Sequence, residues 1–336
     1  MSNERIGIKL GLALVNLDSL PAMPDIAHKL LALPLDTEAG EAQMIRLIEQ
    51  DPQLSAKIVG LANAPLMGVG RKINSIHDAT MLLGLKRMKS VAIGIATMTE
   101  FANQPATKNF DPHDLWLHSI TVALVMNTLS RAMPKQIQPD ENLIFLAGLL
   151  HDIGLMALHH LDSEASDQLH HQLRLQPKRS IAELELELLG TTHGQIGALL
   201  VRHWNLPDEI VEVVGLHHSP RIGDVALANP LVRLANIAEK LLPDLGIVEH
   251  TSETINENDW RELCIDTARV DELAALVNEV AMQVVQLPDT RDASKAIERR
   301  GGAATPATRL PAGKARFSMV LAPMKVMTQW IGSMLR

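Results

Sequence analysis

The sequence predicts an all-α protein, and three observations support this fold class. Apolar residues recur every three or four positions along nearly all of the 336 residues, which is the spacing of amphipathic helices. Pro, Gly, Ser and Asp stand where these stretches begin and end. Only AELELEL, at 182–188, alternates as a strand would, but Glu, Leu and Ala favour helices. No second alternating stretch is there to pair with it, so we expect a helix here as well.

Four helices are predicted in the first hundred residues. The first covers EAQMIRLIEQ, at 41–50. The second begins at Asp51-Pro52, because an aspartate side chain caps a helix and proline fits its first turn. The third begins with the cap of Ser75 and ends at Gly84. The fourth follows and continues through Ile95.

A second helical region is predicted after 103–114, where Pro, Asn and Asp are typical of a connecting segment. Its helices are expected at LWLHSITVALVMNTL (115–129), LIFLAGLLHDIGLMAL (143–158), GTTHGQIGALLVRHW (190–204), PDEIVEVVGLHH (207–218), NPLVRLANIAEKL (229–241) and VDELAALVNEVAMQVVQL (270–287). The predicted organisation is a helical lobe at 14–107, a second lobe at 108–245, a helical extension at 246–300, a linker at 301–316 and a basic amphipathic tail helix at 317–336.

The composition limits the classes of function. The net charge is −8, and four Phe, four Trp and no Tyr are too few aromatics for a surface that stacks bases. A single cysteine, Cys264, excludes an internal disulfide and is typical of a reducing compartment. No apolar stretch approaches the ~18 residues of a membrane span, and the short apolar run at 10–17 does not have the form of a signal peptide. We expect a soluble cytoplasmic protein that does not bind nucleic acid directly.

One carboxylate stands inside the apolar helix predicted at 143–158. Asp152 follows His151, and the two side chains would lie about 100° apart round that helix. A buried carboxylate is costly unless a partner compensates it. The compensation is either a metal ion or hydrogen bonding to a neighbouring histidine, and the sequence leaves both open.

Further histidines are candidates to meet this carboxylate. His118 lies on the apolar stripe of its helix, His193 stands in the first turn of another, and His217 and His218 end a third. Imidazole together with carboxylate is a donor set that iron, manganese and zinc accept. The alternative for each is a hydrogen-bonded core residue or a polar helix end. We assign the surface or ordinary packing to five others: His159, His160, His170, His171 and His203.

The order His118, His151-Asp152 and a later polar position resembles the HD superfamily of metal-dependent phosphohydrolases. The additional His193 and His217-His218 resemble the HD-GYP branch, which hydrolyses cyclic di-GMP. A closer resemblance, to the HDOD family, covers about residues 17–240. It rests on LDSLPAMPDIAHKLLAL, LIEQDPQLSAKIVGLANAPLMG, RKINSIHDATMLLGLKRMKSVAIG, FLAGLLHDIGLMAL and HWNLPDEIVEVVGLHHSP. This resemblance implies a multi-helix bundle with an N-terminal lobe and an HD-like second lobe, in a bacterial signalling protein without demonstrated hydrolase activity.

Three departures from the HD enzymes argue against catalysis. The last metal ligand of that superfamily is an aspartate, and alignment of LVRLANIAEK places Asn236 there. Many active members carry a lysine where this chain has Leu155, and the glutamate expected after the double histidine is Ser219, with no GYP sequence following. Asp152 is then the only carboxylate among the matched positions to balance an ion, and Asn236 could add a weak carbonyl ligand.

The preferred hypothesis is therefore a non-catalytic signalling scaffold that binds signalling proteins and has no cofactor. Its vestigial or weak metal site would comprise His118, His151, Asp152, His193, His217, His218 and Asn236. The alternative hypothesis is a metal-dependent phosphohydrolase that holds iron, manganese or zinc and acts on a nucleotide or cyclic dinucleotide.

Two basic segments are candidate binding surfaces. Five bases lie between 71 and 89, where Asp78 is the only acid: Arg71, Lys72, Lys86, Arg87 and Lys89. They would bind an anionic protein or a nucleotide second messenger, although a solvated helix face is the simpler explanation. Residues 301–336 contain five bases and no acid. The tail helix would dock on a membrane surface or a partner, or pack on its own domain.

Overall fold

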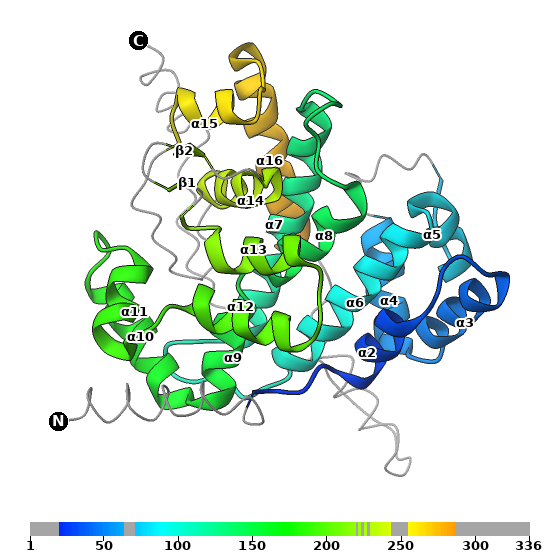
Figure 1. Cartoon of the computed structure of the whole chain (residues 1–336), viewed down its shortest axis with the longest axis horizontal. Helices are drawn as coiled ribbons and strands as arrows, with labels where there is room; N and C mark the ends of the chain where they lie inside the picture. Colours follow the sequence, from blue (N-terminus) through cyan, green and yellow to red (C-terminus); the bar gives the residue numbers. More distant parts are fainter. Residues whose placement is uncertain are drawn as a thin grey trace, which may run out of the picture. The chain divides into compact units, whose positions relative to one another are not determined.

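Helices make up nearly all of the described structure, as the sequence predicts. The structure is a computed structural model that describes residues 20–63, 71–219, 221–222, 225–226, 229–242 and 255–285 (Figure 1). The predicted caps are confirmed at two helix starts: Asp51 accepts hydrogen bonds from the backbone of Gln53 and Leu54, and Ser75 accepts one from Asp78. Among the described residues, the only strands are the two-residue pair β1 (Arg221–Ile222) and β2 (Val225–Ala226). The all-α class is therefore confirmed.

The N-terminal helices gather around one long helix, α6. They are α2 (Asp25–Ala32), α3 (Glu38–Glu49), α4 (Pro52–Ala62), α5 (Ile76–Leu83) and α6 (Leu85–Ala102). Helices α2, α3, α4 and α5 all contact α6, which in turn packs on the second half of the fold. Gly84 makes the sharp turn between α5 and α6 with a φ of 80°, a backbone conformation that side-chain-bearing residues rarely adopt. The indole of Trp204 donates a hydrogen bond to the backbone oxygen of Pro21 at 3.0 Å and so ties the start of the described chain to the later helices.

The second half is built around α7, which is buried on nearly every side. Its helices are α7 (Pro112–Ala132), α8 (Glu141–Leu150), α9 (Ile153–Leu161), α10 (Ser163–Leu175), α11 (Ile181–Leu189), α12 (His193–His203), α13 (Asp208–Leu216), α14 (Pro230–Leu241), α15 (Glu257–Glu262), the short 3-10 helix η3 (Thr267–Arg269) and α16 (Val270–Val285). Helices α8, α14 and α16 pack against α7 (Figure 1). The helix predicted at 182–188 is confirmed as α11.

The helix predicted at 143–158 is interrupted where its two polar residues stand. Helix α8 ends at Leu150, α9 begins at Ile153, and His151 and Asp152 form the turn between them. The prediction that both residues lie on one helix is therefore corrected. Asp152 occupies the N-cap position of α9 but makes no capping hydrogen bond. Its carboxylate contacts buried histidines instead.

The same two helices qualify the expectation that no segment could span a membrane. Among the described residues, Glu141–Leu161 has a mean hydropathy of 1.5 and is long and apolar enough by composition. However, 89% of its apolar window is buried inside the fold. Core helices of a folded domain have this character, and the packing of one glycine shows why the segment is buried here. Because a Cβ on Gly148 would lie 2.4 Å from the Cα of Ala123, α8 must pack directly against the backbone of α7.

All described helices belong to one contact unit that ends at Val285. The predicted linker at 301–316 and tail helix at 317–336 lie outside the described residues. The same is true of 14–19, 243–254 and 286–300, which belong to the predicted lobes and extension.

Candidate metal centre

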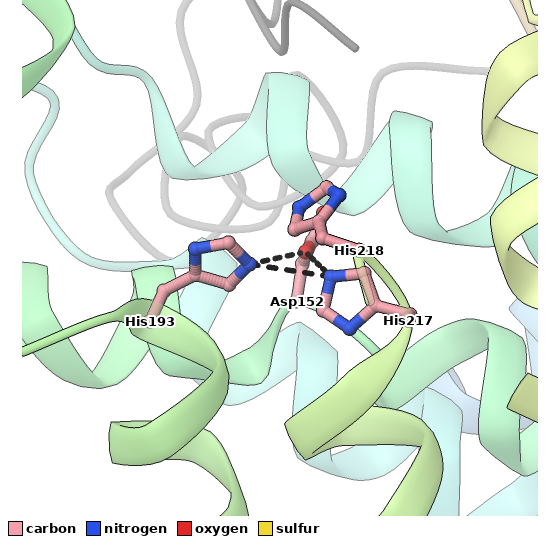
Figure 2. A group of neighbouring side chains, drawn as sticks. All are labelled: Asp152, His193, His217 and His218. Atoms are coloured by element: carbon pink, nitrogen blue, oxygen red, sulfur yellow. Dashed lines mark hydrogen bonds and ion pairs between the residues drawn. The ribbon is translucent and has the colours of Figure 1, made fainter. Parts of the chain in front are cut away.

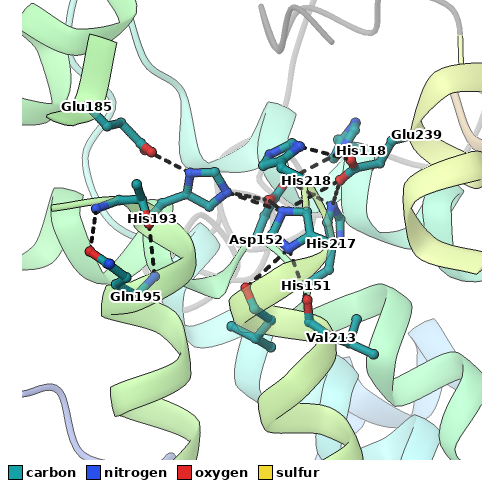
Figure 3. A network of polar contacts seen from close by, with 12 residues as sticks. His118, His151, Asp152, Glu185, His193, Gln195, Val213, His217, His218 and Glu239 are labelled. Atoms are coloured by element: carbon teal, nitrogen blue, oxygen red, sulfur yellow. Dashed lines mark hydrogen bonds and ion pairs between the residues drawn. The ribbon is translucent and has the colours of Figure 1, made fainter. Parts of the chain in front are cut away.

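Five structural elements bring seven titratable side chains together in the interior (Figure 3). The contributors are His118 from α7, His151 and Asp152 from the α8–α9 turn, His193 from the start of α12, His217 and His218 from the end of α13, and Glu239 from α14. All six sequence-predicted histidine and aspartate candidates are thus in one place. Glu239 is a seventh that the sequence analysis did not select.

Asp152 contacts four imidazoles of this group, and Figure 2 shows it beside His193, His217 and His218. One carboxylate oxygen, Oδ2, is 2.9 Å from His151 Nε2 and 3.4 Å from His118 Nε2. The other, Oδ1, is 3.2 Å from His217 Nε2 and 3.4 Å from His193 Nε2. Each oxygen of this one carboxylate therefore faces a different pair of imidazoles.

Glu239 supplies a second buried carboxylate. Its Oε1 is 2.8 Å from His151 Nε2 and 3.9 Å from His217 Nε2, and its Oε2 is 3.4 Å from His218 Nδ1. The expectation that Asp152 is the only carboxylate at the centre is corrected. Asn236, one turn earlier on α14, donates its side-chain amide to the backbone oxygen of His217 at 2.8 Å. It therefore holds the end of α13 in place.

Three of the histidines are oriented by acceptors outside the centre. Nδ1 of His151 lies 2.8 Å from the backbone oxygen of Gly148, and Nδ1 of His217 lies 3.1 Å from two carbonyl oxygens of α13. Nδ1 of His193 lies 2.7 Å from the carboxylate of Glu185. Because each acceptor needs a proton on Nδ1, the Nε2 atom of each neutral imidazole presents its lone pair to the centre.

Most of these inward atoms meet as buried ion pairs rather than in hydrogen bonds of good geometry. Nε2 of His151, both oxygens of Asp152 and both oxygens of Glu239 are buried and have no partner with hydrogen-bond geometry among the described residues. Nε2 of His193 and Nε2 of His217 are only 3.2 Å apart. Lone pairs and negative oxygens at such distances repel one another unless protons or a cation stand between them.

The pKa shifts at the centre reflect the same close contacts between imidazoles and carboxylates. Burial lowers the pKa of His151 and of His193, but the neighbouring carboxylates outweigh it and hold both well above the usual histidine value. Burial raises the pKa of Asp152, but His151 and its neighbours hold it well below the usual value. Burial and the adjacent His217 lower the pKa of His218 to about 3. Without an ion, the centre is therefore held by charged imidazoles against charged carboxylates.

Glu185 is a second residue that the sequence analysis missed. It lies on α11 with no exposed surface, and its Oε1 accepts the Nδ1 proton of His193. A carboxylate behind a histidine fixes the tautomer of the ring and makes its other nitrogen a stronger donor. The Glu185–His193 pair is typical of the surroundings of a metal ligand.

The donor atoms form two overlapping sets, each within 4.8 Å. One set comprises His118, His151, Asp152 and Glu239; the other comprises Asp152, His193, His217 and His218. The residues present fit a metal ion, because their donor atoms are buried and converge, and because the carboxylate oxygens of Asp152 and Glu239 have no partner with hydrogen-bond geometry among the described residues. The donor types suit zinc, iron or manganese.

The five bases between 71 and 89 are not gathered at this centre. Arg87 pairs with Glu141, and Lys89 donates to the backbone oxygens of Leu31 and Leu33 at 2.9 and 2.7 Å. Arg71, Lys72 and Lys86 are exposed.

The fold and the centre define an HD-like helical protein. The chain belongs to the HDOD domain family, whose family model matches residues 20–220. An uncharacterised protein of Treponema pallidum (strain Nichols) is 24% identical over 232 residues, which are 64% of this chain and 43% of that protein. The chain therefore matches less than half the length of that relative.

Two solved structures show the same fold. The HDOD domain protein of unknown function from Geobacter sulfurreducens is 25% identical with a TM-score of 0.66, over 85% of this chain and 99% of that one. A protein of Shewanella amazonensis SB2B, provisionally named a metal-dependent phosphohydrolase, is 22% identical with a TM-score of 0.55, over 83% of this chain and 100% of that one.

Proposed function

We propose that this chain is a signalling module that binds one transition metal ion at the buried centre and acts through contacts with other proteins rather than through turnover. The observation that supports metal binding is the inward orientation of three imidazoles, those of His151, His193 and His217. Their Nδ1 atoms face outer acceptors, so the Nε2 lone pairs of the neutral rings would repel the two carboxylates and each other unless protons or a cation stand between them. One divalent cation between them would remove this repulsion.

The charge of the centre supports a single ion. Asp152 and Glu239 together carry two negative charges, which balance one divalent ion, while bound imidazoles are neutral. A second ion would leave an excess positive charge in a buried place, which is costly. His118, His151, Asp152 and Glu239 form the set with two carboxylates, so we assign the ion to these four residues.

The enclosure of the centre supports a non-catalytic role. A transition metal ion can act as a Lewis acid toward water and phosphate. Here, however, the side chains of His151, Asp152, His193, His217 and Glu239 are at most 1% exposed, and only His218 reaches 18%. Leu155 is fully buried where many HD enzymes carry a lysine, so this position gives no cation to a phosphate in a transition state.

A hydrolysis assay separates the two roles. Protein loaded with manganese, iron or zinc is incubated with bis(p-nitrophenyl) phosphate and with cyclic di-GMP. The proposal predicts no turnover above the metal-free control, although the protein retains its ion. Turnover that Asp152→Asn abolishes while the variant stays folded would overturn the non-catalytic role.

A phosphohydrolase is the second candidate, and one observation favours it. Glu239 restores a second carboxylate, and Asp152 presents one oxygen to each donor set, as a carboxylate bridging two ions does. This candidate predicts two metal ions per chain and hydrolysis in the assay above. One ion without turnover would reject it.

A further inference from the structure

Helix α5 carries an apolar side that is exposed in the described part of the chain. The helix buries Ile76, Ala79, Thr80 and Leu83 against its neighbours. On the side away from them, Met81 is 71% exposed and Leu82 is 38% exposed. Met81 is the most exposed large apolar residue among the described residues.

Positive charge surrounds this apolar side. Arg71 and Lys72 precede α5, and Lys86 lies in the first turn of α6; all three are exposed. Asp78 is the only acid between 71 and 89, and its contact with Arg71 is an exposed pair at 3.7 Å. Such a pair contributes little, so the charge of this face remains positive in a chain whose net charge is −8.

The start of α6 adds to the positive potential. A helix N-terminus carries partial positive charge and is usually stabilised by acids or by a capping side chain. Here Gly84 is the N-cap residue and gives no side-chain cap, and the first turn contains Lys86 and Arg87 but no acid. Arg87 is paired with Glu141, so Lys86 is the exposed base of this turn that adds to the positive potential of the helix start.

We propose that the α5 face, defined as Arg71, Lys72, Met81, Leu82 and Lys86, docks an acidic amphipathic helix of a partner protein. Carboxylates on the flanks of that helix would pair with the three bases, and its apolar stripe would pack on Met81 and Leu82. Methionine suits this role because its flexible thioether adapts to varied partner surfaces. This proposal rests on the proposed protein-binding role and specifies the kind of partner. It does not depend on the metal centre.

Other occupants fit this face less well. Two apolar side chains give little area for insertion into a bilayer. The chain's own residues 301–336 carry five bases and no acid, so their charge is not complementary. Nucleic acid is disfavoured because none of the five residues of the α5 face is aromatic.

The probe is a labelled peptide of about 20 residues, long enough to form a helix, with leucines along one face and glutamates on the flanks. Its binding to the full chain is followed by fluorescence anisotropy, and its position by hydrogen exchange. A second peptide of the same composition, with leucines distributed all round the helix, tests whether amphipathicity matters. We expect the first peptide to bind more tightly than the second and to protect the amides of 71–86.

Two variants, each with a matched control, test the proposal. Lys72→Glu/Lys86→Glu should weaken peptide binding roughly tenfold or more, and Met81→Ser should weaken it severalfold. The matched controls are Lys135→Glu/Lys178→Glu, which changes the net charge equally at exposed positions elsewhere, and Met282→Ser, at a methionine that is 48% exposed. Both controls should bind as the unchanged protein does, and all variants should keep its thermal midpoint.

Several results would overturn the proposal. One is equal affinity for the two peptides, or equal loss in the variants and their controls. A second is binding to vesicles with 30% phosphatidylserine that Lys72→Glu/Lys86→Glu abolishes while peptide binding is absent; this outcome would assign the face to a membrane. A third is a dimer that Met81→Ser dissociates, which would assign the face to a second copy of this chain.

Discussion

Glu239 Oε1 lies 2.8 Å from His151 Nε2, and the two side chains form a buried ion pair. The two residues come from α14 and from the α8–α9 turn, which are distant in sequence. Their contact determines the charge of the centre, because it adds a second carboxylate to Asp152. The case for a retired metal site rested in part on a single carboxylate among the matched positions, so this contact favours the proposal that the centre binds an ion.

Glu239→Gln tests the assignment of the ligand on α14. The substitution preserves size but removes one of two charges that balance the ion. We expect metal affinity to fall by at least about 100-fold, measured by competition with a chromophoric chelator. Asn236→Ala is the matched control, because it removes only a hydrogen bond to a backbone oxygen. It should cost about 1 kcal/mol of unfolding free energy and leave metal affinity nearly unchanged; the reverse ranking would refute the assignment.

Glu185→Gln tests the residue behind His193. The amide still occupies the space but is a weaker acceptor for Nδ1, so metal affinity should fall only if His193 takes part in holding the ion. If it does, the expected loss is roughly 10–100-fold. Glu187→Gln on the same helix is the control, because Glu187 is 57% exposed and pairs with Arg179. It should change neither metal affinity nor stability by more than about 0.5 kcal/mol; equal effects of the two substitutions would contradict a special role for Glu185.

Metal binding should strengthen as the pH rises. The raised pKa values of His151 and His193 mean that both are protonated in the metal-free protein near neutral pH. An ion held by His118, His151, Asp152 and Glu239 must displace the proton of His151, so its dissociation constant should fall by up to about tenfold per pH unit for each proton released. Titration calorimetry in buffers of different ionisation enthalpy counts the protons. A dissociation constant that is constant from pH 6 to 8, with no proton release, would count against this picture.

The metal-free protein, in contrast, should become less stable as the pH rises above neutral. A histidine whose pKa is raised on folding contributes stability that is complete below its unfolded pKa of about 6.5. That contribution is lost as the pH rises through the folded pKa. Thermal unfolding of metal-free protein from pH 6 to 10 should therefore show a falling midpoint, which bound metal should reduce or abolish. A midpoint that rises over this range without metal would contradict the charge assignment.

Gly154→Ala tests how closely α9 must approach α12. A Cβ at this position would lie 1.9 Å from the backbone oxygen of His193, so the two helices would have to separate and His193 would move. We expect a loss of unfolding free energy of roughly 3 kcal/mol or more, as for overpacked cores, and weaker metal binding. Gly60→Ala is the control. Gly60 lies inside α4, and a Cβ added there would meet no neighbouring group within 4 Å. It should stabilise the protein by about 0.5–1 kcal/mol; similar unfolding curves for the two variants would rule out this account.

The sequence predicted the helices well because their signals are local. Caps such as Ser75 and turns such as Gly84 act within a few residues of themselves, and α11 was predicted from the helix propensity of its residues despite their alternation. The break at His151-Asp152 was missed because both flanks are apolar. The apolar residues continue in helical register across the break, and the close approach of Gly154 to α12 is a tertiary contact that the sequence alone does not show.

The sequence predicted the histidines and the aspartate of the candidate site but missed two of its glutamates. Histidines in apolar stripes are rare enough to stand out, and those selected are brought together at the centre. Glu185 and Glu239 were missed because acids on helices usually face solvent. A signal existed in each case: Glu185 stands four residues from both Ile181 and Leu189 on the buried stripe of α11, and Glu239 follows Ala235 in the same way on α14. An acid in register with an apolar stripe therefore predicts a buried polar partner.

The most direct test of the central claim is the metal content of the protein. The full chain is purified anaerobically without chelators or a histidine tag, and bound iron, manganese and zinc are measured by elemental mass spectrometry alongside His151→Ala. The account predicts close to one transition metal ion per chain, lost in the variant while its helical content remains. Only trace metal, in a protein that also fails to take up added zinc, iron or manganese, would contradict it and leave the centre held by charged histidines alone.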